Sequence, residues 1–307
     1  MNFIGKFKYD FRFNKALMLM ILPAVLFFAL FAYIPMGGII IAFKRLDYMK
    51  GIFGSPWIGF NNFKFFFLTG KAWTVTRNTV LYNAAFIAVG TILQVSVAVF
   101  LSEIGKKFFK KITQSLMLLP YFVSWVVVAA IVYNIFNFDY GLLNTTFKSL
   151  GIQPLNVYQN PGAWIPMIIF FQAWKSAGYG SIIYMAAIMG IDAEMYEAAD
   201  IDGATIFQKI RRITLPSLLP TVIILTLLAI GQIFRGDFNM FYNLIGNNGL
   251  LFNATDVIDT YSFRTMLYSQ DFGMAAAVGL FQSVLCCAIL MVTNFFVRRA
   301  DPDRALF

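Results

Sequence analysis

Residues 172–179 place hydrogen-bonding groups and aromatic rings inside a long apolar stretch. A lysine at the middle of a membrane span costs about 3 kcal/mol on insertion scales, so it is expected to face a cavity or a partner. Aromatic faces can stack on a hydroxylated ligand, and amide and hydroxyl groups can bind its oxygens. We therefore predict a ligand site formed by Gln172, Trp174, Lys175, Ser176 and Tyr179. The alternatives are plain packing for the two aromatic rings, and snorkelling or an acidic partner for the lysine.

A second polar cluster interrupts the apolar segment that follows, and it contains Gln232, Arg235, Asp237, Phe238 and Asn239. Gln232 lies deepest in the segment and is the better candidate to line a cavity. Arg235 and Asp237 are compatible with an ion pair at the mouth of that cavity. They are equally compatible with the simple end of a membrane span among lipid headgroups.

Residues 197–220 form a polar, helix-compatible segment between these two apolar stretches. Gly203 allows two short helices to meet at a bend, and Ala198 lets a partner surface come close. The charge of Glu197 suits an arginine on a partner protein. An apolar stripe at three-to-four spacing is predicted from Ala199, Ile206, Phe207, Ile210 and Ile213. These features suit a segment that docks on a partner protein, which we call the docking segment; the alternative is an ordinary connector between two spans.

The residue types that most enzymes use are sparse in this chain. It contains no histidine, and its two cysteines, Cys286 and Cys287, are adjacent in an apolar run. The phosphate-binding pattern G-x-x-x-x-G-K-[ST] does not occur. We therefore predict no catalytic residues, no metal site and no ATP hydrolysis by this chain.

Composition places the chain in a membrane. It is 59% hydrophobic and 13% charged, whereas soluble proteins are about one quarter charged. A helix needs about 20 apolar residues to cross a bilayer. We predict a single all-α integral membrane domain over residues 1–307 with six transmembrane helices, near 16–43, 79–101, 114–137, 164–190, 217–242 and 273–297. Residues 191–216 form the loop that contains the docking segment. The first apolar run is too long for a signal peptide, and it is expected to bend or end near Pro35.

Basic residues predict the orientation of these spans. Four clusters fall on the same side of a six-span chain: Lys6, Lys8, Arg12 and Lys15; Lys106, Lys107, Lys110 and Lys111; Lys209, Arg211 and Arg212; and Arg298, Arg299 and Arg304. The positive-inside rule puts that side, with both termini, in the cytoplasm of a bacterial cell. The first external loop is also basic, but long loops weigh less in the rule.

The docking segment resembles the EAA motif of the membrane subunits of ABC importers. Glu197-Ala198-Ala199, Gly203, Ile213 and Leu215-Pro216 have the spacings of that motif. The resemblance implies a type I ABC importer permease fold and a short coupling helix that docks into a cleft of a separate ATPase. The positions that it implies for this contact are Glu197, Ala198, Ala199, Asp202, Gly203, Ala204, Phe207, Ile213 and Pro216.

A narrower resemblance covers nearly the whole chain. The strings at residues 34–38, 55–60, 119–125, 141–144 and 174–175 are similar to the polysaccharide-type branch of carbohydrate permeases. In maltose-type permeases the segment about twenty residues before the EAA glutamate lines the sugar site, and Trp174 and Tyr179 match aromatic positions there. The resemblance implies a second, related permease in a heterodimer, two ABC ATPase subunits that bind ATP and magnesium, and an extracellular solute-binding lipoprotein. It implies no cofactor on this chain and no nucleic-acid partner.

These observations predict the permease subunit of an ATP-driven importer that takes up a carbohydrate by alternating access. The narrower prediction is that this carbohydrate is an oligosaccharide. An EAA-type importer of an amino acid or a peptide is the first alternative, because many importers share this loop. A self-contained channel or proton-driven transporter is the second. The lack of histidine and the few carboxylates within the spans leave little for a proton relay.

Overall fold

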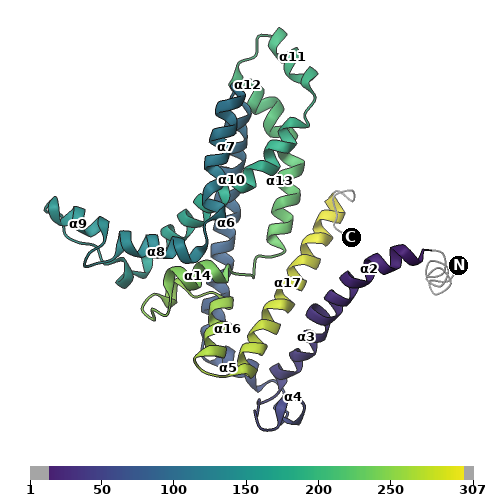
Figure 1. Ribbon diagram of the computed structural model, residues 1–307, viewed down its shortest axis with the longest axis vertical. Coiled ribbons are helices and arrows are strands. Elements are labelled where there is room, and N and C mark those ends of the chain that lie inside the picture. Colours follow the sequence, from purple (N-terminus) through teal and green to yellow (C-terminus); the bar gives the residue numbers. More distant parts are fainter. Residues whose placement is uncertain (1–13, 301–307) are drawn as a thin grey trace.

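The computed structural model describes residues 14–300, and this part of the chain is built from helices, with a single isolated β-bridge between Lys44 and Trp57 (Figure 1). The α-helices are α2 (Lys15–Phe28), α3 (Ile34–Met36), α4 (Gly51–Gly54), α5 (Asn61–Leu68), α6 (Lys71–Ser102), α7 (Lys107–Phe122), α8 (Trp125–Phe136), α9 (Leu142–Ser149), α10 (Pro161–Met189), α11 (Ala193–Ile201), α12 (Ile206–Lys209), α13 (Leu215–Ile230), α14 (Phe238–Ile245), α15 (Phe252–Thr255), α16 (Ile258–Leu267) and α17 (Phe272–Ala300). Ala29–Tyr33 and Ile210–Thr214 are π-helical, and Gly37–Phe43 and Val157–Gln159 are 3-10 helical.

Four helical stretches of the described chain are long and apolar enough to cross a membrane: Lys15–Phe43, Lys71–Ser102, Ile206–Ile230 and Phe272–Arg299. Helices α7 and α8 make a fifth span if the pair is counted as one, although it is bent by 90°. Helix α10 is long enough at 29 residues, but Gln172, Lys175 and Ser176 reduce its apolar character. The all-helical membrane architecture is therefore confirmed, whereas the count of six spans is not.

Two predicted spans differ in their boundaries from the helices of the structure. The span predicted at 114–137 breaks at Val123 and Ser124, where the Ser124 hydroxyl caps α8 by accepting the Val127 N–H. The span predicted at 217–242 ends at Ile230, and α14 follows as a separate helix. That span also begins at Ile206, within the segment expected to be a loop, because α12, a π-helical turn and α13 are continuous.

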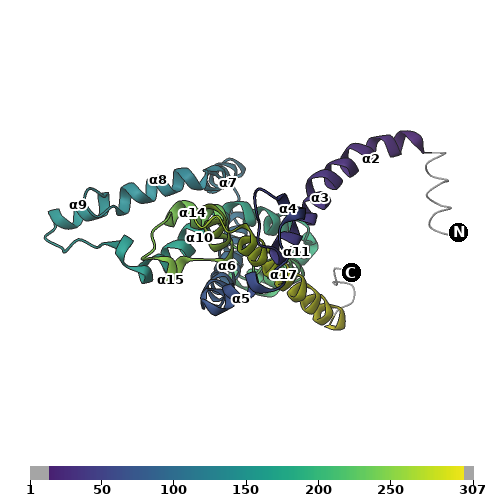
Figure 2. The ribbon, with the colours of Figure 1, turned by 90° about the horizontal axis from the view of Figure 1, so that it is seen from below.

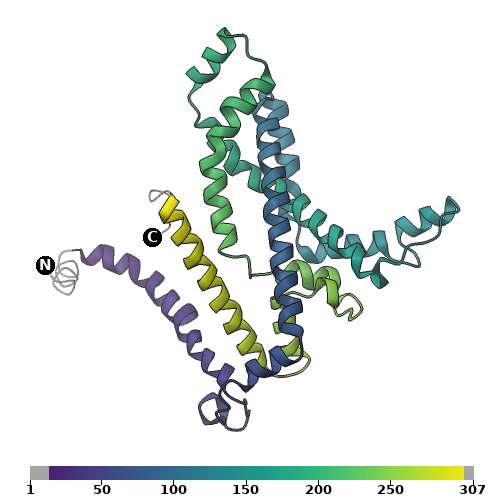
Figure 3. The ribbon, with the colours of Figure 1, turned by 180° about the vertical axis from the view of Figure 1, so that it is seen from behind.

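Helices α6 and α10 form the centre of the molecule. One core cluster joins Tyr82 of α6 and Trp164 of α10 to Phe241 of α14. A second cluster, nearer to α11, contains Tyr184 of α10 and Leu218 of α13. Helices α8 and α9 extend to one side of this centre, as Figures 1 and 3 both show.

Helix α2 lies apart from the central helices. Figure 2 shows it projecting away from α6 and α10, and none of its residues is buried within this chain. Three of the predicted N-terminal basic residues, Lys6, Lys8 and Arg12, and Arg304 near the C-terminus lie outside the described residues.

The turn at residues 231–237, between α13 and α14, is held by side chains of neighbouring helices. Asn83 of α6 donates to the carbonyl oxygens of Ile233 and Arg235, both at 3.0 Å. Asp259 of α16 accepts the Gly236 N–H at 2.6 Å and also a hydrogen bond from Gln282 of α17. Non-helical backbone within a membrane protein persists only where protein or a water-filled cavity satisfies its polar groups. These contacts therefore permit the span to end at Ile230.

We predict that Asn83→Ala destabilises the protein by about 1–3 kcal/mol, because the two turn carbonyls lose their donor. Asn134→Ala is the matched control, since the Asn134 amide donates only to Ala130 within its own helix. Thermal unfolding of both purified variants in detergent measures the difference. Equal midpoints for the two variants would contradict the prediction.

Candidate functional site

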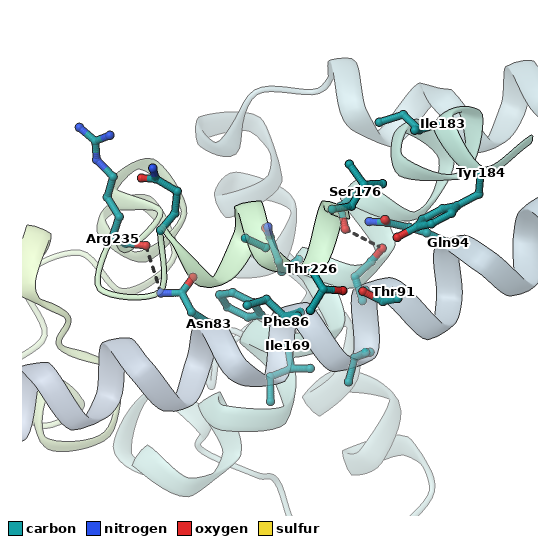
Figure 4. Close-up of a pocket in the computed structure, with 18 residues that line it drawn as sticks. Asn83, Phe86, Thr91, Gln94, Ile169, Ser176, Ile183, Tyr184, Thr226 and Arg235 are labelled. Atoms are coloured by element: carbon teal, nitrogen blue, oxygen red, sulfur yellow. Dashed lines mark hydrogen bonds between the residues drawn. The ribbon is translucent and has the colours of Figure 1, made fainter. Parts of the chain in front are cut away.

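A polar cavity of about 360 Å³ lies between α6, α10, α13 and the turn that follows α13 (Figure 4). Its polar lining residues are Asn83, Thr91, Gln94, Gln172, Ser176, Tyr184, Thr226, Gln232 and Arg235. Arg235 is the one charged residue among the lining side chains. The cavity therefore presents amide and hydroxyl groups with little net charge.

Three amides of this cavity are available to a ligand. The side chains of Gln94, Gln172 and Gln232 form no hydrogen bond to any part of the chain that the structure describes. By contrast, Asn83 is already engaged by the backbone of the neighbouring turn. Unpaired amides at a cavity wall need water or a ligand to satisfy them.

The structure brings four of the predicted ligand residues to this cavity: Gln172, Ser176, Gln232 and Arg235. Sequence reasoning missed the wall contributed by α6. Asn83, Thr91 and Gln94 are spaced by eight and three residues, which places them on one face of a helix. That spacing was a usable signal within a strongly apolar segment.

Trp174 and Tyr179 lie outside the polar cavity. Trp174 lines a separate, mostly apolar cavity of about 500 Å³ with residues of α6 and α7. The Tyr179 ring stacks on that of Tyr121, with centroids 4.2 Å apart and planes inclined by 7°. One face of Tyr179 is therefore already covered within the chain.

The Lys175 ammonium group is bound by backbone carbonyls of this chain. Its Nζ donates to the oxygens of Pro120 at 3.1 Å and Tyr121 at 2.7 Å, and also to that of Val123. An ammonium group has three donors, and all three have acceptors here. The lysine thus caps the end of α7, where the break before α8 exposes carbonyl groups.

Asp237 and Phe238 fix the start of α14. Asp237 accepts the Met240 N–H at 3.0 Å as a helix cap, and it accepts the indole N–H of Trp125 at 3.1 Å. No ion pair joins it to Arg235 among the described residues. The Phe238 ring stacks on Tyr242. The ion-pair interpretation of this cluster is therefore wrong, and Asp237 instead caps α14. Asn239 is exposed beside it.

Residues 193–214, which contain most of the EAA motif, are called the EAA segment from here on. This segment forms two helices, α11 and α12, around Gly203, at the far end of the molecule in Figure 1. Gly203 has a φ of +71°, a left-handed conformation that favours glycine, and Thr205 and Gln208 cap α12 reciprocally. Lys209 pairs with Asp200 at 2.7 Å across the turn. A further bond at 2.9 Å joins the Tyr196 and Thr214 hydroxyls. The predicted single apolar stripe is wrong, because Ala199 and Phe207 belong to different helices.

The turn of the EAA segment exposes large apolar side chains. Ile201 is 88% exposed and Phe207 is 85% exposed, while Glu197 is exposed on α11. Ile210, in contrast, packs against the core cluster of α6 and α10. The segment therefore has one apolar side directed into the molecule and another left open.

The opposite end of the molecule contains a buried ion pair between Asp256 and Arg264. Burial raises the pKa of the Asp256 carboxyl, although the Arg264 guanidinium and the Thr260 hydroxyl favour its charged form. Arg264 also lies 3.7 Å from the centroid of the Phe252 ring. A cavity of about 580 Å³ adjoins the pair and includes Lys71 and Tyr268.

Comparison with known proteins identifies the family of this chain. The family model described as "Binding-protein-dependent transport system inner membrane component" matches residues 87–302. The chain belongs to this family.

Within the described residues, no group of three histidine, cysteine, aspartate or glutamate side chains is arranged to hold a metal ion.

Family members of similar length match almost the whole chain. Protein LplB of Bacillus subtilis is 32% identical over 94% of this chain and 91% of its own length. The polygalacturonan/rhamnogalacturonan transport system permease protein YteP of the same organism is 33% identical over 94% and 90%. A chain in the crystal structure of a bacterial ABC transporter that imports the acidic polysaccharide alginate is 31% identical, with a TM-score of 0.86 over 96% of this chain and 99% of that chain.

We predict that Gly178→Ala destabilises the protein by about 1–3 kcal/mol, because helices α7 and α10 touch at this residue. A Cβ atom there would lie 1.9 Å from the Met117 carbonyl oxygen, so the helices must separate. Gly90→Ala is the control, since its Cβ would meet only the Gln94 side chain at 3.7 Å. Chemical denaturation in detergent compares the two, and a Gly178→Ala variant as stable as wild type would contradict the close packing.

Proposed function

We propose that this chain is one membrane-spanning subunit of an ATP-driven importer that takes up an oligosaccharide delivered by an extracellular binding protein. The family supports binding-protein-dependent transport. The relative YteP is named for polygalacturonan and rhamnogalacturonan transport, and a Thermococcus litoralis relative, 28% identical, for trehalose and maltose. These names favour a carbohydrate over an amino acid or a peptide.

The observation that carries the proposal is the cavity with its unpaired amides. An oligosaccharide offers many hydroxyl groups and needs donors and acceptors at several points along its length. Gln94, Gln172 and Gln232 come from three different segments and supply both kinds of group. Substrate sites in transporters are expected near the middle of the bilayer, where helices of different segments meet.

The exposed end of the EAA segment is proposed to contact a separate ATPase that binds ATP and magnesium. Phe207 and Ile201 supply an apolar anchor, and Glu197 supplies a charge for a basic partner residue. The Lys209–Asp200 ion pair and the Tyr196–Thr214 hydrogen bond connect α11 to the helix that continues into α13. Movement of the docked segment would thereby reach a wall of the cavity.

A second permease subunit is proposed to complete the transport path. Helix α2 has no buried residue within this chain, so its apolar surface is open to a second membrane subunit. In this proposal α11 and both termini lie on the cytoplasmic side, because the EAA segment must meet the ATPase there and the basic clusters favour that side. The complete complex would therefore contain two permeases, two ATPases and, outside the cell, the binding protein.

We predict that Gln172→Ala and Gln94→Ala each lower sugar uptake roughly three- to tenfold, the loss of one ligand hydrogen bond. Gln114→Ala on α7 is the control, because this residue does not line the cavity. Uptake of labelled oligosaccharide and basal ATP hydrolysis are measured in one preparation of the reconstituted complex. Uptake unchanged in both cavity variants would exclude this cavity as the site, and uptake without ATP would exclude the importer.

We predict that Phe207→Ser weakens recovery of the ATPase with the permease but leaves the thermal stability of the permease unchanged. The Phe207 side chain has little contact within its own chain, so its removal affects a partner contact alone. Phe108→Ser, which replaces a phenylalanine that is 78% exposed on α7, is the matched control. Affinity purification through the permease measures the ATPase that is retained. Equal recovery from both variants would contradict the proposed contact.

A further inference from the structure

Lys175 binds the break between α7 and α8 from the neighbouring helix α10. The last carbonyl groups of a helix have no partner within it, and the 90° bend turns α8 away from those of α7. The carbonyls of Pro120, Tyr121 and Val123 all accept from the one ammonium group. The carbonyl groups at the bend are therefore hydrogen-bonded by a charged side chain that belongs to another helix.

Aromatic contacts extend this attachment to both sides of the break. The Lys175 Nζ lies 5.8 Å from the centroid of the Tyr121 ring on α7 and 5.4 Å from that of Trp125 on α8. Tyr121 in turn stacks on Tyr179, one helical turn further along α10. Because cations favour the faces of aromatic rings, these contacts fix α7 and α8 relative to α10 as one unit.

The same unit reaches the rim of the cavity. The indole N–H of Trp125 donates to Asp237, which caps the first turn of α14. The turn that precedes Asp237 contains Gln232 and Arg235, which line the cavity. A continuous set of contacts thus runs from Lys175, through one tryptophan and one aspartate, to the cavity rim.

The other end of α10 leads to the EAA segment. Helix α10 ends at Met189, and only residues 190–192 separate it from α11. We propose that Lys175 is a positioning residue of the transport cycle, which makes the α7–α8 bend and the cavity rim move with α10 and the EAA segment. This inference rests on the proposed function in one respect: it assumes that the EAA segment is driven by an ATPase.

The test uses the complete complex reconstituted in vesicles with its binding protein. Lys175→Met removes the charge and its hydrogen bonds, and Lys175→Arg restores a cation with fixed donor geometry. Trp125→Phe removes the indole N–H that Asp237 accepts and replaces the indole with a smaller aromatic ring. Lys148→Met is the matched control, because Lys148 also donates to a backbone carbonyl, that of Asp139, and lies 6.0 Å from a phenylalanine ring, but on α9.

Two readouts are measured for each variant. One is sugar imported per ATP hydrolysed, and the other is the ATP-dependent change in thiol labelling of a reporter, Asn239→Cys, in the exposed first turn of α14 that Asp237 caps. The reporter is placed in a chain whose native Cys286 and Cys287 are alanine. We expect Lys175→Met to keep basal ATP hydrolysis, to lower import per ATP roughly five- to tenfold and to abolish the labelling change. Lys175→Arg should recover part of both, and Trp125→Phe should resemble Lys175→Met in direction.

Wild-type coupling and labelling in Lys175→Met would overturn the inference, and so would an equal loss in Lys148→Met. If Lys175→Met does not assemble, Trp125→Phe decides, and unchanged readouts in that variant overturn it. A wild-type complex that imports no sugar yet shows ATP-dependent labelling would contradict the proposed substrate alone. In that case the labelling change in the Lys175 and Trp125 variants still tests the linkage.

Discussion

Backbone hydrogen bonding in an apolar medium is the constraint on which this structure depends. Every peptide group within a membrane needs a partner from the protein, and a helix provides it only while it is unbroken. At three breaks in its helices, a side chain from a neighbouring helix supplies hydrogen bonds to the free carbonyl groups. Asn83 donates to carbonyl groups of the turn after α13, and Lys175 donates to those at the end of α7. Asn78 of α6 donates to the carbonyls of Asn253 and Asp256. The helices can therefore end where function needs an opening.

The same constraint divides the polar residues of the spans into two groups. Lys175, Asp237 and Asn83 are engaged by backbone groups or by caps, so they hold the architecture. Gln94, Gln172 and Gln232 face the cavity without a partner among the described residues. Their amide groups are half-buried or exposed at the cavity wall, so water or a bound molecule can satisfy them. Hydrogen-bonding state, and not residue type, separates the two groups.

Much of this architecture follows from sequence, and what does not has a physical reason. Apolar length and the EAA spacing predict the membrane helices and the bend at Gly203, which depend on local sequence alone. The break at Ser124 had a local signal, a capping serine before an apolar run, but hydropathy averages over it. The partners of Lys175 had no such signal. They lie more than fifty residues away along the chain, so only the packing of α10 on α7, which Gly178 makes close, reveals them.

The apolar surfaces left open on α2 and on the EAA segment differ in what can cover them. Helix α2 is apolar after Lys15, so lipid tails and another membrane helix can cover it equally well. Ile201 ends α11 and Phe207 lies in α12, on either side of a short, polar turn and beside Asp200 and Lys209. Such a turn does not enter hydrocarbon, because its charges would lose their hydration. Burial of these two side chains therefore requires a protein surface, and the Lys209–Asp200 ion pair joins the two short helices beside them.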